Sequence, residues 1–256
     1  MLTDNGVVSL IGAGGKTTLM FRLAARLAGS GKKVLTTTTT RILQPLPGQS
    51  PRLILSPDAG EILSRSRDAF RRHSHVTAGR EQSAARGKVL GLDPAVIDQL
   101  RQSALYDWII VEADGAARRP LKTCARHEPV VSRSTTHIVA VAGLSAVGRP
   151  LTDATVFRAE QFSRVTALPL NMPVTAGAMA RALVHDLARA DADRTDTRRI
   201  VFLNQADLPG AEATGQQVAG LIQSISRRSR RPVDRILLGA LRRSTAVRQW
   251  YPGTRP

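Results

Sequence analysis

The residues best suited to chemistry stand near the start of the chain, in a glycine-rich segment with one lysine and two hydroxyls. The segment reads Gly12-Ala13-Gly14-Gly15-Lys16-Thr17-Thr18. Glycines let successive backbone N–H groups turn toward one anion, which also meets the positive end of a helix that begins there. A lysine in this position contacts the β- and γ-phosphates of a nucleotide, and the hydroxyl after it binds Mg²⁺. The segment therefore predicts a phosphate-binding loop, with Lys16 as a catalytic residue and Thr17 as a metal ligand.

The residues on both sides of this segment match the context that a phosphate-binding loop requires. Val7 to Ile11 read as a buried strand, and apolar residues at helical spacing follow from Leu19 to Leu27. One departure is that Leu10 occupies the position of the first glycine in the usual pattern, which predicts a shorter or differently wound loop. A plain glycine turn before a helix is the alternative, and the flanking strand and helix favour the phosphate-binding loop.

Two acids at the end of a later strand are expected to complete the nucleotide site. Trp108 to Val111 read as a buried strand, and Glu112, Asp114 and Gly115 follow it. Phosphoryl transfer needs a carboxylate for Mg²⁺ and a backbone group that contacts the γ-phosphate. Open α/β sheets bind ligands at the carboxyl ends of their strands. We therefore expect Glu112 and Asp114 to be catalytic or to bind Mg²⁺, without a choice between them, and Gly115 to contact the nucleotide.

A third strand end resembles the Asn-Lys-x-Asp pattern with which many GTP-binding proteins hold guanine. Asn204 and Asp207 are present, and Gln205 replaces the lysine that normally covers the base. The Asp carboxylate of this pattern accepts hydrogen bonds from the guanine ring. A helix-capping loop explains the same residues, so the expected cofactors are Mg²⁺ with either GTP or ATP.

Apolar strands that alternate with helices predict the layers that position these residues. Further strands are expected at residues 33–38, 53–55, 138–142 and 200–203, and helices at 58–72, 94–104, 152–165, 177–190 and 211–228. This alternation is typical of a parallel sheet covered on both faces. We predict an α/β, P-loop NTPase-like three-layer fold with a mostly parallel sheet and a small irregular insertion. One domain is expected over residues 1–245, with a possible inserted subregion at about 45–105 and a loose tail over 246–256.

Composition and charge restrict the possible partners. The only cysteine is Cys124, so no internal disulfide is possible, and 42% apolar residues suffice for a core. The net charge of +17 comes mostly from arginine, spread along the chain apart from one dense run at residues 227–231. Because aromatic residues are scarce, nucleic-acid binding is the alternative function and not the leading one. With no signal-peptide pattern and no apolar run that could cross a bilayer, we expect a soluble, cytoplasmic protein.

Taken together, these segments resemble the YqeC-type family, accessory proteins of selenium-dependent molybdenum hydroxylases. The resemblance runs from about residue 6 to 208, and its most specific stretch is Asp114-Gly115, Arg119-Pro120-Leu121-Lys122 and His127-Glu128-Pro129. The other matching residues are the glycine-rich segment, Thr36 to Thr39 with Arg41, Gly143-Leu144, Val156-Phe157-Arg158 and residues 203–207. The sequence departs from the family at Thr123-Cys124, where the family tends to have Ala-Pro, and at Gln205.

The resemblance implies a Mg²⁺-dependent nucleotide-hydrolysing helper whose partner is a molybdenum hydroxylase or its maturation factors. The arrangement of Glu112 and Gly115 is also similar to that of GTPases that insert metal into nickel enzymes. That analogy implies that Glu112 acts near Mg²⁺ and that the Gly115 amide contacts the γ-phosphate.

Charged residues near the acidic strand end form a candidate site for a second ligand. These are Arg41, Arg118, Arg119, Lys122, His127 and Glu128. Such a cluster suits an anionic acceptor, for example selenophosphate or a pterin phosphate, which would make the protein a small-molecule kinase. A solvated loop is the alternative. For Cys124 we expect a packed, small apolar side chain.

Overall fold

The computed structural model describes residues 5–83, 87–191, 196–229, 231–243 and 247–252. The chain divides into two compact units. The described residues of the first unit lie within Met1–Leu10, Thr17–Gly115 and Val130–His137, and those of the second within Ile11–Lys16, Ala116–Pro129 and Ile138–Pro256. The division was not visible from composition, because both units share one pattern of alternating strands and helices.

The first unit is built on parallel strands. Their order is β1-β8-β2-β5-β4, and each strand pairs in parallel with its neighbours. The bounds are β1 (Gly6–Gly12), β2 (Val34–Thr38), β4 (Leu53–Leu55), β5 (His75–Gly79) and β8 (Trp108–Glu112). All residues of β1, β2, β5 and β8 are buried, as expected for strands covered on both faces. The predicted α/β class with a mostly parallel sheet is confirmed.

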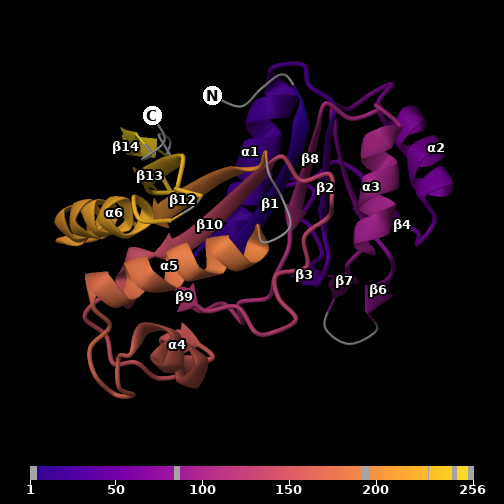
Figure 1. The fold of residues 1–256 in the computed structure, drawn as a ribbon. Coiled ribbons are helices and arrows are strands. Elements are labelled where there is room, and N and C mark those ends of the chain that lie inside the picture. The colour runs from indigo at the N-terminus through magenta and orange to yellow at the C-terminus, as the bar shows by residue number, and fades with distance from the viewer. Residues whose placement is uncertain (1–4, 84–86, 192–195, 230, 244–246, 253–256) are drawn as a thin grey trace. The chain divides into compact units, whose positions relative to one another are not determined.

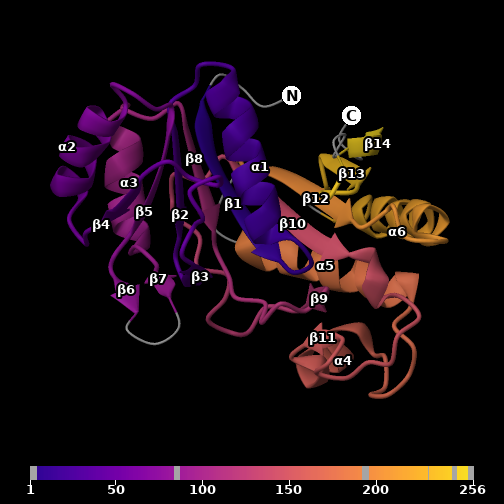
Figure 2. The ribbon, with the colours of Figure 1, turned by 180° about the vertical axis from the view of Figure 1, so that it is seen from behind.

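Three helices belong to this unit. Helix α1 (Lys16–Gly29) runs back along β1 (Figure 2), and α2 (Ala59–Ala69) packs beside α3 (Pro94–Gln102) (Figure 1). The start of α3 is as predicted, because Asp93 accepts a hydrogen bond from the Ala95 N–H at 2.8 Å and proline occupies the first turn. The apolar faces of α2 and α3 share one core with the strands, which includes Ile62, Leu100 and Ile109.

A small antiparallel sheet accompanies the first unit. It consists of β3 (Arg41–Leu43), β7 (Lys88–Leu90) and β6 (Gln82–Ser83). The inserted subregion predicted at about 45–105 is therefore not one piece. Strands β4 and β5 within that range pair with the parallel strands, and Ile54, Val76 and Ala78 are fully buried there.

The second unit contains the strands β10 (His137–Gly143), β12 (Arg198–Asn204), β13 (Arg235–Gly239) and β14 (Val247–Pro252), in the order β14-β13-β12-β10. Helix α5 (Ala176–Ala190) packs against α6 (Ala211–Ser226) and α4 (Ala159–Thr166) (Figure 1). The short strands β9 (Leu121–Lys122) and β11 (Val156–Phe157) pair in parallel, and the 3-10 turn η1 covers Leu144–Ala146.

Two predictions for this unit need correction. The helix predicted over residues 152–165 begins only at Ala159, because β11 and the left-handed Arg158 precede it. The loose tail predicted over 246–256 is wrong for Val247–Pro252, which pair antiparallel with β13. The valine and the two aromatic residues of this segment favour a strand. Residues 246 and 253–256 lie outside the described residues.

Within the described ranges, the helices are too short or too polar to cross a lipid bilayer.

His75 makes the stability of the first unit dependent on pH. Its ring lies 3.0 Å from the Thr36 hydroxyl, and burial lowers the pKa of His75 from 6.5 to about 4. The unfolded chain binds this proton at a higher pH than the folded chain, so stability is full above the ordinary pKa and falls toward pH 4. We expect a loss on the order of 2 kcal/mol between about pH 7 and pH 5.

Denaturant unfolding at both pH values measures this loss. The His75→Gln variant is expected to have a flatter pH profile than wild type, whereas His73→Gln, at an exposed neighbouring position, is expected to retain the wild-type slope. Parallel profiles for wild type and His75→Gln would contradict the assignment.

Candidate functional site

The glycine-rich loop after β1 is a tight turn held by backbone hydrogen bonds. The φ angles of Gly12, Gly14 and Gly15 are 90°, 80° and 140°, which other residues rarely adopt. The Gly14 N–H donates to the Arg119 carbonyl at 3.1 Å, and a Cβ on Gly14 would lie 2.3 Å from the Gly143 nitrogen. Because Leu10 is still part of β1, the loop begins two residues later. This explains the departure from the usual glycine pattern.

Lys16 starts α1 and lies over the loop. It is 4% exposed, and its Nζ donates to the Gly12 carbonyl oxygen at 2.6 Å. The first N–H groups of an α-helix have no acceptor within the helix, and the helix dipole places positive charge there. An anion at this helix start would meet those N–H groups, and Lys16 would exchange the carbonyl oxygen for an anionic one. The geometry is suited to binding phosphate.

Two residues predicted to bind Mg²⁺ are in direct contact. The Thr17 hydroxyl donates to Glu112 Oε2 at 2.7 Å. Glu112 ends β8, is 7% exposed and lies opposite Leu10 and Thr38 in the strand register. The Thr38 hydroxyl donates to the Glu112 carbonyl at 2.8 Å, which fixes the strand end. Hydroxyl and carboxylate oxygens are the ligands that Mg²⁺ prefers, so this pair would hold the ion.

Asp114 and Gly115 continue the chain beyond β8. Asp114 is fully buried, and the peptide before it is fixed because Ala113 donates to the Leu10 carbonyl at 2.9 Å and accepts from Val130 at 3.1 Å. A Cβ on Gly115 would meet nothing within 4 Å, so the approach to its backbone is open. Of the two acids, Glu112 is the one that contacts Thr17. The catalytic or metal-binding role of Asp114 stays a prediction, as does the nucleotide contact of Gly115.

Asn204 lies against the phosphate-binding loop. Its Nδ2 donates to the Gly14 carbonyl at 2.7 Å, and its Oδ1 accepts from the Leu241 N–H at 2.9 Å. Gln205 accepts from the Ser145 N–H at 3.2 Å, and Asp207 pairs with the exposed Arg243 at 3.2 Å. Asn204 thus positions the loop, a role that the sequence pattern did not indicate. Base recognition by Asn204 and Asp207 stays a prediction.

Two residues of the predicted second-ligand cluster, Lys122 and Glu128, form an internal ion-pair network with Arg158. The Lys122 ammonium is fully buried and lies 2.6 Å from Glu128 Oε2, and Arg158 donates to both Glu128 oxygens at 2.6 and 3.1 Å. Burial alone would raise the pKa of Glu128, but the hydrogen bonds from Arg158 and Lys122 lower it to about 2. In this structure, Glu128 is the anion that the cluster binds.

The other residues predicted for the second ligand have different surroundings. Arg119 donates to the Asp153 carbonyl at 2.5 Å, and Arg41, Arg118 and His127 are exposed. Sequence reasoning gave no role to Arg158, although it lies in one of the matching segments. Its partner could not be identified without the pairing of β9 with β11.

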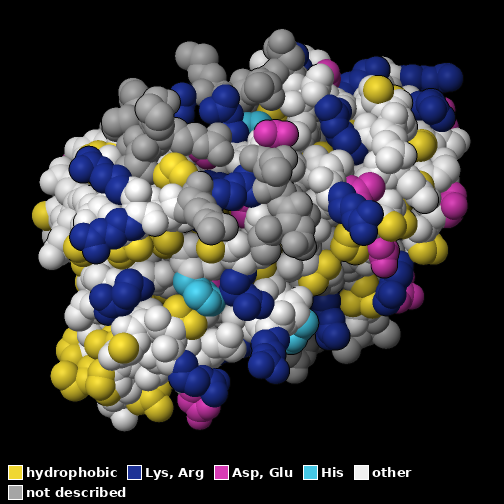
Figure 3. Space-filling view, viewed as in Figure 1, with side chains coloured by type: hydrophobic (Ala, Val, Ile, Leu, Met, Phe, Trp, Pro, Cys, Tyr) yellow, Lys and Arg dark blue, Asp and Glu magenta, His cyan; other side chains and the backbone are white. Residues whose placement is uncertain are grey.

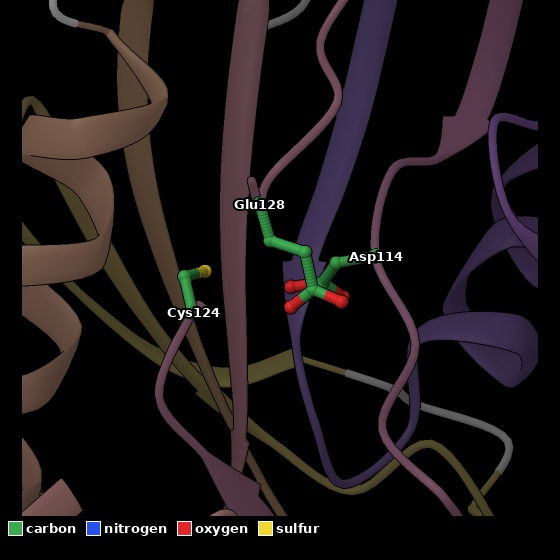
Figure 4. Close-up of side chains that lie close together, drawn as sticks. All are labelled: Asp114, Cys124 and Glu128. Atoms are coloured by element: carbon green, nitrogen blue, oxygen red, sulfur yellow. The ribbon is translucent and has the colours of Figure 1, made fainter. Parts of the chain in front are cut away.

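Cys124 is a packed side chain in a fixed backbone. Its N–H lies 3.2 Å from both carboxylate oxygens of Asp186, and its carbonyl accepts from Gln161 at 2.6 Å. The Cys124 sulfur and a Glu128 oxygen lie within 4.8 Å of one another, and Figure 4 shows the two side chains. Because Glu128 already binds two cations, this pair is no open ligand set. The fully buried side chain agrees with the expected small apolar role.

The arginine run considered for nucleic-acid binding ends α6. Arg227 and Arg228 line a surface cavity of about 330 Å³, whereas Arg231 turns to the buried Asp191 at 2.8 Å. Arg230 lies outside the described residues. Lys and Arg side chains are spread over the face seen in Figure 3 and do not gather in one patch. Nucleic-acid binding by this run stays a prediction.

Comparison with known proteins identifies relatives of this chain. The family model for YqeC protein matches residues 8–160. The Uncharacterized protein YqeC of Escherichia coli (strain K12) is 31% identical over 204 residues, which cover 78% of this chain and 75% of that protein.

Two solved structures match this chain at low sequence identity. The MinC:MinD cell division protein complex of Aquifex aeolicus gives a TM-score of 0.46 at 13% identity, over 91% of this chain and 81% of that one. Signal Recognition Particle 54 kDa protein from Aeropyrum pernix K1, in complex with GDP, gives 0.42 at 14%, over 99% of this chain and 45% of that one. The family match and the Escherichia coli relative establish that the chain belongs to the YqeC family.

Proposed function

We propose that this protein binds a nucleoside triphosphate with Mg²⁺ at residues 12–18 and hydrolyses it. The observation that supports this best is the 2.7 Å hydrogen bond between the Thr17 hydroxyl and Glu112. It joins the residue after the loop lysine to an acid at a strand end, which is the pairing that Mg²⁺-dependent phosphoryl transfer requires.

The chemistry follows from the surroundings of each group. The helix start and the Lys16 ammonium offer positive charge for the phosphates, while Thr17 and Glu112 offer oxygen ligands for the metal. Bound Mg²⁺ would supply neutralisation of the charge that develops on the phosphate oxygens. Because Glu112 is nearly buried, its charge acts in a medium of low dielectric constant, where electrostatic interactions are strong.

We further propose that nucleotide hydrolysis serves the maturation of a selenium-dependent molybdenum hydroxylase. This part rests on family membership and on the resemblance described above. In such a role the loops after β2 and β8 would change with the nucleotide state and signal to the hydroxylase or its maturation factors. GTP and ATP are both candidate nucleotides, and co-purification with the hydroxylase tests the partner.

The Lys16→Ala variant tests nucleotide binding. We expect its dissociation constants for Mg²⁺–GTP and Mg²⁺–ATP to rise about 10- to 100-fold, because charge-assisted hydrogen bonds to phosphate are lost. Isothermal titration calorimetry measures both constants. The exposed Lys33→Ala is the matched control and should bind like wild type. Equal affinities in Lys16→Ala and wild type, or no binding in either, would refute the proposal.

The Glu112→Gln variant tests the metal ligand. It keeps the size of the side chain but removes the charge, so the Mg²⁺ concentration for half-maximal phosphate release should rise about tenfold. Asp114→Asn, assayed in parallel, shows whether the second acid contributes. A Mg²⁺ dependence that shifts only in Asp114→Asn would transfer the metal role to Asp114.

Base preference is tested at the third strand end. If Asp207 reads guanine, Asp207→Ala should weaken GTP binding about tenfold and leave ATP binding unchanged. Gln205→Lys, which restores the usual pattern, should increase the ratio of GTP to ATP affinity. Arg243→Ala is the control for the loss of the surface ion pair with Asp207. Equal losses for both nucleotides in Asp207→Ala would exclude guanine recognition.

A further inference from the structure

A separate cavity of about 340 Å³ opens in the first unit. Thr39 follows β2, Pro57 follows β4 and Arg80 follows β5, and all three line this cavity. It therefore lies beyond the carboxyl ends of parallel strands, where open α/β sheets bind ligands. Its volume is within the range of small-molecule sites. None of the residues predicted for a second ligand lines it.

Thr39, which we call the floor of this cavity, is hydrogen-bonded to the strand that carries Glu112. The Thr39 N–H donates to the Glu112 carbonyl at 3.1 Å, and the Thr39 hydroxyl donates to the Val130 carbonyl at 2.9 Å. Val130 in turn donates to the Ala113 carbonyl at 3.1 Å. Thr39 is thus held on both sides by the end of β8 and by the segment that follows Pro129. The cavity lining is therefore bonded to the backbone of Glu112, the acid of the proposed nucleotide site.

Gly91, which also lines the cavity, lies so close to Thr39 that only glycine fits at this position. The Gly91 N–H donates to the Thr40 carbonyl at 2.7 Å, and Leu92 donates to the Thr38 carbonyl at 2.8 Å. A Cβ on Gly91 would lie 2.4 Å from the Thr39 carbonyl carbon, a distance that no side chain tolerates. The cavity therefore keeps its shape through backbone contacts and does not depend on flexible side chains.

Arg80 is the cationic side chain of the cavity lining. Pro57, Pro94 and Val96 form apolar walls, and Arg80 supplies a cation whose side chain is 53% exposed. Arg80 pairs with Glu81 at 3.0 Å, an exposed contact of the kind that contributes little. Glu81 itself does not line the cavity, and the acid that does, Asp93, caps α3 and accepts a hydrogen bond from the Ala95 N–H. A ligand anion would thus compete with one weakly held carboxylate for Arg80.

We propose that this cavity binds a small organic anion, with its carboxylate or phosphate on Arg80 and its apolar part against Pro57, Pro94 and Val96. Binding there needs no nucleotide, so the proposal goes beyond the function proposed above. The place beside Glu112 suits a second substrate or a regulator of the nucleotide site.

Ligand-observed NMR titrations of the full chain test this site with three probes of similar size. Phenyl phosphate and benzoate carry the two anionic groups, and benzyl alcohol is the neutral match. Both anions are expected to bind wild type, and the tighter one identifies the preferred group. Arg80→Ala should weaken anion binding about tenfold, whereas Glu81→Gln should strengthen it because the competing carboxylate is gone. Arg71→Ala, at a side chain that is 82% exposed, is the matched control.

Three results would overturn the proposal. They are equal anion binding by wild type and Arg80→Ala, binding of benzyl alcohol as tight as that of benzoate, and no binding of either anion at about 10 mM, which covers millimolar dissociation constants. The Lys16→Ala variant separates the two sites. It should bind benzoate like wild type even where nucleotide binding is lost. Because the loop itself would hold phenyl phosphate through Lys16, the two anions are compared in the Lys16→Ala background, so each proposal can fail without the other.

Discussion

The close approach of three backbone segments at Gly14 is the constraint on which the phosphate-binding loop depends. The Gly14 N–H bonds the Arg119 carbonyl, Gly143 bonds the Pro120 carbonyl, and no side chain fits between them. Two residues further on, Lys122 is anchored by its buried ion pair with Glu128. The stretch from Arg119 to Glu128, which made the family resemblance specific, therefore supports the loop from behind. Lys122 and Glu128 in this stretch stabilise the second unit by pairing with each other.

A buried ion pair contributes little net stability to a segment, because desolvation offsets much of the attraction between the charges. The network around Glu128 reduces that cost with two cations for one carboxylate and with the Phe157 ring, which lies 4.6 Å from the Arg158 guanidinium. Replacement of Glu128 by a neutral residue would remove the carboxylate that both cations share, and breaking a buried ion pair in this way typically costs about 3–5 kcal/mol. The segment behind the loop thus has one favoured conformation.

The sequence allowed the local features to be predicted, because their causes are local. Apolar runs predicted the parallel strands, and Asp93 with Pro94 predicted the start of α3. The features that were missed depend on contacts between distant residues. Arg158 reaches Glu128 across 30 positions and Asn204 reaches Gly14 across 190, and no periodicity reports such pairs. The cavity at Thr39 was not predicted for the same reason. The run of threonines indicates only a strand end, and the contacts of Thr39 with Val130 and Gly91 depend on the fold.

In this structure, donors of the phosphate-binding loop already have acceptors within the protein, and a phosphate would have to replace those hydrogen bonds. Lys16 already donates to the Gly12 carbonyl, and Gly14 already donates to Arg119. A phosphate therefore gains the difference between its bonds and those that it replaces. For Lys16 that difference is favourable, because an anionic oxygen adds a charge–charge attraction to the ammonium that a neutral carbonyl does not offer. The Gly14 amide gains nothing while Arg119 stays in place. Phosphate affinity in this loop thus depends on Lys16 and on the helix start, more than on the amides within the glycine turn.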